Sequence, residues 1–202
     1  DGSVKDTFTL IDDLFLKDVE LLTVSADGKK LAYADSQFNY NGDSLIHIYD
    51  IETGKDYSAA ATGSYISSLV FIDDEHLCAI SNDDMFFSSV EYTGSYTHIS
   101  EGRLNYTCFD TTMKKQWDAE LIYNDVAQGY YIFTLPQRNA MVCYAGNSAC
   151  IVDVATGTVI NKYNTGSSII SVSDWNENGI PEFICSDGDW VLAASNDSND
   201  IL

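Results

Sequence analysis

The chain has 202 residues, of which 45% are hydrophobic and 20% charged, a composition typical of a globular protein and not of a disordered one. Acidic residues outnumber basic ones 31 to 10, which gives a formal net charge of −21 at pH 7. A field of that sign repels phosphate backbones and anionic lipid, so we expect no nucleic-acid partner. No stretch reaches the roughly 20 apolar residues of a membrane span, so we expect no membrane insertion.

One turn occurs three times in the chain, each time between a short apolar run and a second run of β-forming residues. The three copies begin at Asp50, Asp110 and Asp153. Asp opens such a turn by bonding its own backbone, and Gly supplies the positive φ that closes it. A turn repeated between strands indicates a repeat architecture.

The runs around these turns predict four consecutive units of short antiparallel strands. The predicted strands are 19–25, 31–35, 45–50 and 56–61; 65–72, 76–81, 104–110 and 115–121; 129–135, 140–145, 148–153 and 158–163; and 168–173, 182–186 and 189–194. The fourth unit therefore stops before an outer strand. Residues 1–11 align with the outer strand of the third unit, and residues 12–18 give the single weak helical signal.

Four such units with closely spaced turns favour a β-propeller over a β-sandwich. We predict an all-β fold: a β-propeller of four-stranded antiparallel blades, about four of them visible, as a single domain or segment over residues 1–202. The predicted blades are 18–61, 65–121, 126–164 and 168–195, with 1–11 as an additional outer strand. Either the two termini pair and close the ring, or the chain is a segment of a larger ring. Because the chain has no Met at position 1 and no signal peptide, we expect a processed or excised piece.

Two turns carry a family resemblance. Residues 25–32, Ser-Ala-Asp-Gly-Lys-Lys-Leu-Ala, resemble the first turn of WD40-like blades. Residues 110–117, Asp-Thr-Thr-Met-Lys-Lys-Gln-Trp, are similar to the outer turn of quinoprotein-like (PQQ-like) blades, with Met113 where those blades usually carry Gly. The Gly-His dipeptide of true WD40 repeats is absent. The resemblance implies a propeller fold and says little about function.

The five cysteines include no Cys-x-x-Cys pair. Cys78, Cys143 and Cys185 each follow an aliphatic residue in a predicted second strand, and Ala32 fills that place in the first unit. A position that accepts Ala or Cys favours a small buried side chain, so we predict buried, reduced and equivalent thiols. A tight turn between Cys143 and Cys150 would set them opposite each other as a hydrogen-bonded pair of the antiparallel ladder. The Cα atoms of such a pair lie farther apart than those of a non-hydrogen-bonded pair, which does not favour a disulfide.

Aromatic residues gather in two predicted loops. The second unit has an insertion at 83–102, between its second and third strands, and the matching loop of the first unit is also aromatic. In a propeller all such loops leave on one face, so we predict a binding face there. Its candidate residues are Phe38, Tyr40, Phe86, Phe87, Tyr92 and Tyr96. The alternative is that the insertion forms a hairpin that packs its own rings on the blade.

The fourth unit contains a loop with the spacing of metal ligands. Residues 174–182, Asp-Trp-Asn-Glu-Asn-Gly-Ile-Pro-Glu, place oxygen side chains at positions 1, 3, 5 and 9 and Gly at position 6, which suits Ca²⁺. The spacing resembles the calcium loops of integrin-type FG-GAP blades. That resemblance implies the ligands Asp174, Asn176, Asn178 and Glu182, with the carbonyl of Ile180 completing the set. The alternative is an ordinary Asn-Gly turn, although this copy is longer than its counterparts.

Catalytic motifs are scarce. His47, His76 and His98 are scattered over two units, and there is no Gly-x-Ser-x-Gly elbow or phosphate loop. We therefore predict a non-catalytic binding or scaffold module whose aromatic loop face binds a protein, a peptide or a small ligand. The negative charge favours a basic partner. The module could also associate with the rest of a larger propeller. The alternative is the propeller part of a larger hydrolase or oxidoreductase whose catalytic residues lie outside this chain. The compartment stays open, because acidity favours the outside of the cell and unpaired cysteines favour the cytoplasm.

Overall fold

The computed structural model describes residues 21–35, 44–63, 65–82, 102–123, 130–165, 167–175, 177–178, 180–187 and 190–194. These residues form the strands β1 to β15 and one 3-10 turn, η1 (Pro136–Arg138). No helix in this part of the chain is long and apolar enough to cross a membrane. The predicted outer strand at 1–11 and the helical signal at 12–18 lie outside the described residues.

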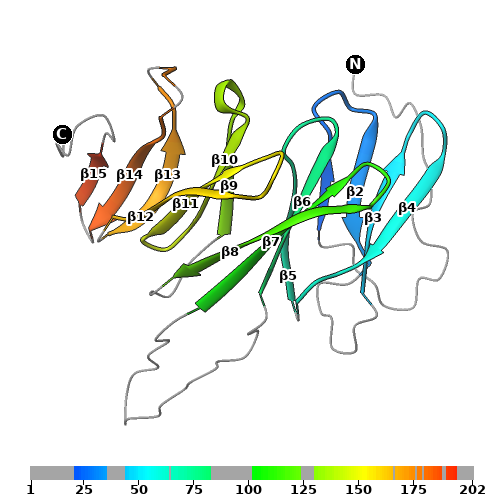
Figure 1. Cartoon of the computed structure of the whole chain (residues 1–202), viewed down its shortest axis with the longest axis horizontal. Coiled ribbons are helices and arrows are strands. Elements are labelled where there is room, and N and C mark those ends of the chain that lie inside the picture. The colour runs from blue at the N-terminus through cyan, green and yellow to red at the C-terminus, as the bar shows by residue number, and fades with distance from the viewer. Residues whose placement is uncertain are drawn as a thin grey trace, which may run out of the picture.

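The strands form four antiparallel sheets that follow one another in chain order (Figure 1). Sheet 1 contains β1 (Leu22–Val24), β2 (Lys30–Ala34), β3 (Leu45–Asp50) and β4 (Lys55–Ala60). Sheet 2 contains β5 (Tyr65–Phe71), β6 (His76–Asn82), β7 (Gly102–Asp110) and β8 (Lys115–Tyr123). Sheet 3 contains β9 (Tyr130–Leu135), β10 (Ala140–Ala145), β11 (Ser148–Asp153) and β12 (Val159–Asn164). Sheet 4 contains β13 (Ser168–Ser173), β14 (Glu182–Asp187) and β15 (Trp190–Ala194).

Within each sheet the strands pair in chain order, so every sheet is a simple meander. This arrangement confirms the prediction of an all-β fold built from four consecutive units. Sheets 1 and 4 lie at opposite ends of the molecule (Figure 1), so the described sheets form an open row and not a closed ring of four.

Neighbouring sheets pack face to face, and each contact buries one apolar core. We call the side of a sheet that faces the next sheet its forward face and the opposite side its backward face. Between sheets 1 and 2, the forward face supplies Ala32, Ala34, Ile46 and Ile48, and the backward face supplies Ile66, Leu69, Leu77 and Ala79. Sheets 2 and 3 enclose a second core, and sheets 3 and 4 a third. Side chains alternate along a strand, so a central sheet contributes to two cores.

All five cysteines are buried free thiols, which confirms that part of the prediction. Their predicted equivalence is wrong. Cys78 lies on the forward face of sheet 2, whereas Cys143 and Cys185 lie on the backward faces of sheets 3 and 4. The first turns of the sheets differ in length, and a shift of one residue along a strand moves a side chain to the other face.

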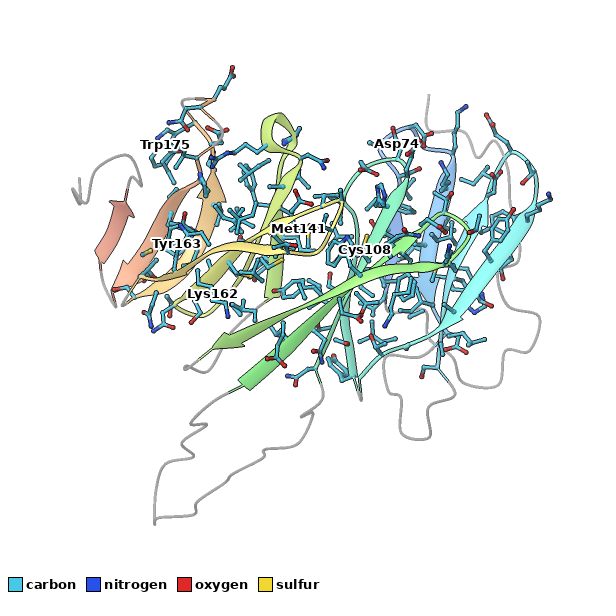
Figure 2. The ribbon with its side chains drawn as sticks, viewed as in Figure 1. Asp74, Cys108, Met141, Lys162, Tyr163 and Trp175 are labelled. Atoms are coloured by element: carbon cyan, nitrogen blue, oxygen red, sulfur yellow. The ribbon has the colours of Figure 1, made fainter. Side chains whose placement is uncertain are left out.

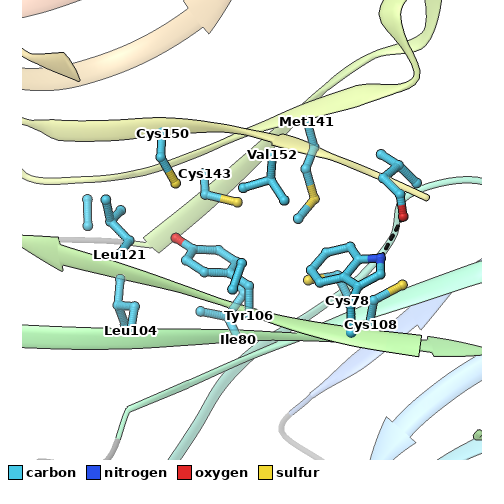
Figure 3. Close-up of a cluster of buried hydrophobic side chains, with 14 residues drawn as sticks. Cys78, Ile80, Leu104, Tyr106, Cys108, Leu121, Met141, Cys143, Cys150 and Val152 are labelled. Carbon is cyan, nitrogen blue, oxygen red and sulfur yellow. Dashed lines mark hydrogen bonds between the residues drawn. The ribbon is translucent and has the colours of Figure 1, made fainter. Parts of the chain in front are cut away.

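Four of the thiols lie in the core between sheets 2 and 3 (Figure 3). Cys143 is opposite Cys150, as predicted, and Cys78 is opposite Cys108. Burial raises the pKa of the Cys78 and Cys143 thiols well above the ordinary value. The same cause, with the nearby carboxylates of the second sheet, raises the pKa of Cys108 to about 12.

The three repeated turns form at the outer strands of sheets 1, 2 and 3. In each one the Asp side chain accepts a backbone N–H at 2.8 to 2.9 Å, from Thr53, Thr112 or Thr156. The closing residue is left-handed in all three: φ is 67° at Gly54, 60° at Met113 and 70° at Gly157. Met113 thus adopts the conformation of the Gly that it replaces, and its side chain is buried in the core between sheets 1 and 2.

Trp117 on β8 links sheet 2 to the outer turn of sheet 3. Its ring lies against Gly157, and its Nε1 donates a hydrogen bond to the carbonyl oxygen of Val154 at 2.6 Å (Figure 3). The residue is buried, so this contact fixes the outer edge of the interface between the two sheets.

Candidate functional sites

The six aromatic residues of the predicted binding face lie outside the described residues: Phe38, Tyr40, Phe86, Phe87, Tyr92 and Tyr96. The structure does describe the strand ends that bracket their two loops. At the end of β2, Ala34 lies opposite Ile46 near the start of β3. At the end of β6, Asn82 lies opposite Leu104 near the start of β7. In sheet 3 the corresponding connection is a two-residue turn, Gly146-Asn147.

Backbone hydrogen bonds tie that turn to the link between sheets 3 and 4. Thr165 donates its N–H to the Asn147 carbonyl at 2.9 Å, and Ile169 donates to the Gly146 carbonyl at 2.7 Å. Sheet 1 shows the same relation, because Ala61 donates to the carbonyl of Ser44, the residue before β3, at 2.9 Å. The links between sheets and the second-to-third-strand connections therefore leave the sheets at one end, as the meander topology requires.

The predicted calcium loop connects β13 to β14, and all but Asn176 and Gly179 of its residues are described. Asp174 Oδ1 accepts the N–H of Asn178 at 3.0 Å, and Asn178 Oδ1 accepts the N–H of Ile180 at 2.7 Å. Glu182 Oε2 accepts the N–H of Trp175 at 3.1 Å. Three predicted ligand side chains therefore fold back on the backbone of the same short loop.

Burial differs sharply within this loop. The Glu182 side chain is fully buried, whereas Trp175 is half-exposed at the end of β13 (Figure 2). Glu177 is left-handed, with a φ of 57°, and its N–H bonds to the Asp174 carbonyl at 3.3 Å.

Other metal-binding chemistry has little support in the described part of the chain, where no group of three or more His, Cys, Asp or Glu side chains is placed to hold a metal. The calcium loop has only two carboxylates at its ligand positions, Asp174 and Glu182, and its Asn176 lies outside the described residues. Calcium binding therefore stays a prediction.

The two described histidines occupy separate places. His47 Nδ1 lies 2.9 Å from Asp56 Oδ2, and its ring stacks on Tyr33 with 4.6 Å between centroids. His76 Nδ1 lies 2.9 Å from Asp73 Oδ1 in the first turn of sheet 2. Each histidine pairs with a carboxylate of its own sheet, so the two do not form one site.

Sequence reasoning missed a set of half-exposed apolar side chains on the first strands of the sheets. They are Leu22 and Val24 on β1, Tyr131 on β9 and Ile170 on β13. That these residues lie in strands was readable from the sequence. Which sheet face stays open was not, because that depends on the order of the sheets in space.

Solved propeller structures are similar to this chain over most of its length. The WD40 domain of coronin from Toxoplasma gondii matches with a TM-score of 0.57 and 16% identity, over 89% of this chain and 45% of that chain. This chain is a partial β-propeller. Its four sheets are consecutive blades, and the WD40-like resemblance of its turns is confirmed at the level of the fold.

Two enzymes with known structures also match the propeller. Dihydro-heme d1 dehydrogenase NirN in complex with DHE has a TM-score of 0.54 and 12% identity, over 90% of this chain and 35% of that chain. Acylaminoacyl peptidase in complex with Z-Gly-Gly-Phe-chloromethyl ketone has a TM-score of 0.54 and 12% identity, over 92% of this chain and 32% of that chain. The propeller thus spans about a third to a half of the solved chains that it matches.

No protein-family profile matches the sequence, and no curated protein is similar to it. Identities of 12 to 16% show the fold alone, since one fold carries many unrelated functions.

Proposed function

We propose that this propeller is a non-catalytic binding or scaffold module whose partner docks on the face with the second-to-third-strand loops. The observation that supports this most directly is the geometry of the strand ends. The connections that follow Ala34 and Asn82 start from the same end of their blades as the Gly146-Asn147 turn. The similarity to a WD40 domain supports an interaction module in general terms.

The residue types in the two loops support a protein or peptide partner. Rigid aromatic rings lose little conformational freedom on binding and are frequent at interface hot spots. The net charge of −21 surrounds them with a negative field, which favours a protein or peptide with basic residues at its rim.

Replacing Phe86 and Phe87 by Ser together is expected to weaken capture of basic peptides about 30-fold or more, the effect of losing one hot-spot residue of about 2 kcal/mol. The measurement is binding to arrayed basic, neutral and acidic peptides, with the melting temperature recorded in parallel. Ile160→Ser is the matched control, because Ile160 is an exposed apolar residue on the outer strand β12. A double variant that unfolds, or that binds basic peptides like the wild type, would contradict the proposal.

A second candidate function is the propeller part of a larger hydrolase or oxidoreductase, associated with further blades and with a catalytic domain. It is favoured by the two enzymes that match the propeller over 35% and 32% of their own chains. A coding sequence for such a domain next to that of this chain would favour the enzyme over the binding module.

We also propose that the 174–182 loop binds Ca²⁺ through Asp174, Asn176, Asn178 and Glu182 with the Ile180 carbonyl. The hydrogen bonds of Asp174, Asn178 and Glu182 within the loop support this, because they hold the side-chain oxygens close to the chain turn. With two carboxylates we expect a dissociation constant of about 10⁻⁴ to 10⁻³ M, the range of extracellular calcium modules.

Calcium at about tenfold above that dissociation constant is expected to raise the melting temperature by about 3–5 °C, because only the folded loop binds the ion. Asp174→Ala should abolish the shift. Asp27→Ala is the control, since Asp27 holds the first turn of another blade through hydrogen bonds with Ser25 and Lys29. Identical melting curves of the wild type with calcium and with chelator would show that the loop is a turn that does not bind calcium.

A further inference from the structure

The core between blades 2 and 3 contains two pairs of cysteines that lie opposite each other on neighbouring strands. Cys143 on β10 is opposite Cys150 on β11, and Cys78 on β6 is opposite Cys108 on β7. All four residues are fully buried in the same core (Figure 3). The two pairs share one apolar environment and one cross-strand arrangement, so a difference in their chemistry must come from their immediate neighbours.

The backbone spacing of Cys143 and Cys150 is compatible with a disulfide. The two residues form the third pair from the Gly146-Asn147 turn. In a hairpin with a two-residue turn the first and third pairs are hydrogen-bonded, and the Cα atoms of such a pair lie about 5.5 Å apart. This is the wider of the two antiparallel spacings, but it lies within the range of about 4.4–6.8 Å that disulfides span.

The thiols of the two pairs have different hydrogen-bond partners. Cys143 donates a hydrogen bond to Cys150, the other member of its own pair. Cys78 and Cys108 each donate to the backbone carbonyl oxygen of the next residue in the chain, at 3.9 Å. The partner of sulfur is therefore sulfur in the first pair and backbone oxygen in the second.

The charged neighbours of the two pairs have opposite signs. Cys150 lies opposite Lys162 on the outer strand β12 (Figure 2). The hydrogen bond from Cys143 lowers the pKa of Cys150 against the effect of burial, and the ammonium of Lys162 acts in the same direction as the hydrogen bond. At the other pair, burial and two carboxylates of blade 2 raise the pKa of Cys108 to about 12. Because the thiolate is the nucleophile, Cys150 is the more reactive of these two thiols.

The outer strand next to each pair sets the access to it. β12 is the edge strand beside Cys150, and all six of its residues are exposed or half-exposed. Its register against β11 shifts between Ile151 and Val152, next to Cys150. An exposed edge strand with an interrupted ladder opens locally at a low free-energy cost, and this opening admits a reagent to Cys150. Cys108 lies instead opposite Trp117, which is itself buried and held by its hydrogen bond to blade 3.

We propose that Cys150 and Cys143 are a reversible oxidation site that forms a disulfide when a small-molecule disulfide is the oxidant, while Cys78 and Cys108 stay reduced. Cys150 Sγ, as the thiolate, attacks one sulfur of the oxidant and forms a mixed disulfide, and the other sulfur leaves as a thiolate. Cys143 then loses its proton and attacks Cys150 Sγ, which releases the second thiolate. Two electrons pass to the oxidant, and the two protons given up by the cysteines end on the two released thiols. A nucleophilic Cys beside a resolving Cys is the arrangement of reversible redox sites.

The test treats the folded chain with oxidised glutathione, quenches the reaction with acid, and alkylates the remaining thiols after denaturation for peptide mapping by mass spectrometry. We expect one disulfide, between Cys143 and Cys150, with the other three of the five cysteines alkylated. Dithiothreitol should restore five free thiols. A folded chain that keeps all five thiols would overturn the proposal, and so would a first disulfide in another pair, whether Cys78 with Cys108 or Cys78 with Cys143.

Single substitutions test the order of the two steps. Cys143→Ala should stop at the mixed disulfide and carry one glutathione on Cys150. Cys150→Ala should take up glutathione at least about tenfold more slowly, because the remaining thiol, Cys143, has a pKa raised by burial. Cys78→Ala is the matched control from the same core and should form the disulfide at the wild-type rate. Uptake by Cys150→Ala as fast as by Cys143→Ala would overturn the role of Cys150 as the attacking thiol.

Lys162 is exposed, so its replacement tests the charge without removing a core contact. Lys162→Met should slow the formation of the disulfide about two- to threefold, the effect of one partly exposed charge on a thiolate. Lys162→Arg keeps the charge and should restore the wild-type rate. Equal rates in the Met and Arg variants would overturn the assignment of Lys162 as the residue that favours the thiolate.

Discussion

Gly157→Ala is expected to destabilise the propeller by about 2–5 kcal/mol, from a left-handed backbone cost of about 1–2 kcal/mol and an overpacking cost of about 1–3 kcal/mol. Gly157 has a φ of 70°, which an L residue adopts only at a cost. A Cβ there would lie 2.7 Å from Cγ and Cδ2 of Trp117 and 2.8 Å from its Cβ. The ring cannot move aside easily, because it is buried and hydrogen-bonded to Val154.

Gly54→Ala separates the two contributions. Gly54 closes the outer turn of blade 1 with a φ of 67°, and a Cβ there would meet only the Tyr49 hydroxyl oxygen at 3.7 Å. This variant should therefore lose only the backbone part, about 1–2 kcal/mol. Urea unfolding of both variants measures the difference. Equal losses of unfolding free energy in the two variants would show that the Trp117 ring moves aside at little cost and that the contact between blades 2 and 3 adapts to the added methyl group.

The outer turns show what local sequence could predict. Asp, Thr and Gly at fixed spacing specify hydrogen bonds and a positive φ within a few residues, and these formed at Asp50 and Asp153. Met113, which stands where such turns usually carry Gly, is left-handed as well. Its burial between two blades could not be read from the turn, because the covering residues belong to another blade.

The cysteines show where the same reasoning failed. Their burial follows from residue type, but the face that each one occupies depends on the length of the preceding turn. The contact of Trp117 with Gly157 joins residues of different blades, so no local pattern indicates it. The candidate binding face rests on topology, whereas the exposure of Leu22 depends on which sheet faces the neighbouring blades cover.

The free energy of unfolding is expected to fall steeply above about pH 9 because of the buried thiols. Burial raises the pKa of Cys78 and Cys143, and burial with the carboxylates of Asp73 and Asp110 raises the pKa of Cys108 to about 12, from an ordinary value of 9.0. Below pH 9 these thiols are protonated in both states, so their contribution to stability is fully present. Above it the unfolded chain releases their protons while the folded chain retains them, and the contribution is lost up to about pH 12.

Cys108 alone accounts for about 4 kcal/mol of that loss at 1.36 kcal/mol for each unit of pKa, against a typical total stability of about 5–15 kcal/mol. Urea unfolding with reductant at pH 8 and pH 10.5 measures the loss, and Cys108→Ala should reduce it by about 2 kcal/mol, the part of the shift between the ordinary pKa and pH 10.5. Cys150→Ala is the control, because a hydrogen bond from the Cys143 thiol lowers the pKa of Cys150. The other titratable groups are common to all three proteins, so the difference between variants isolates the thiol. A Cys108→Ala protein that loses as much stability as the wild type would show that the Cys108 thiol ionises as readily in the folded propeller as in the unfolded chain.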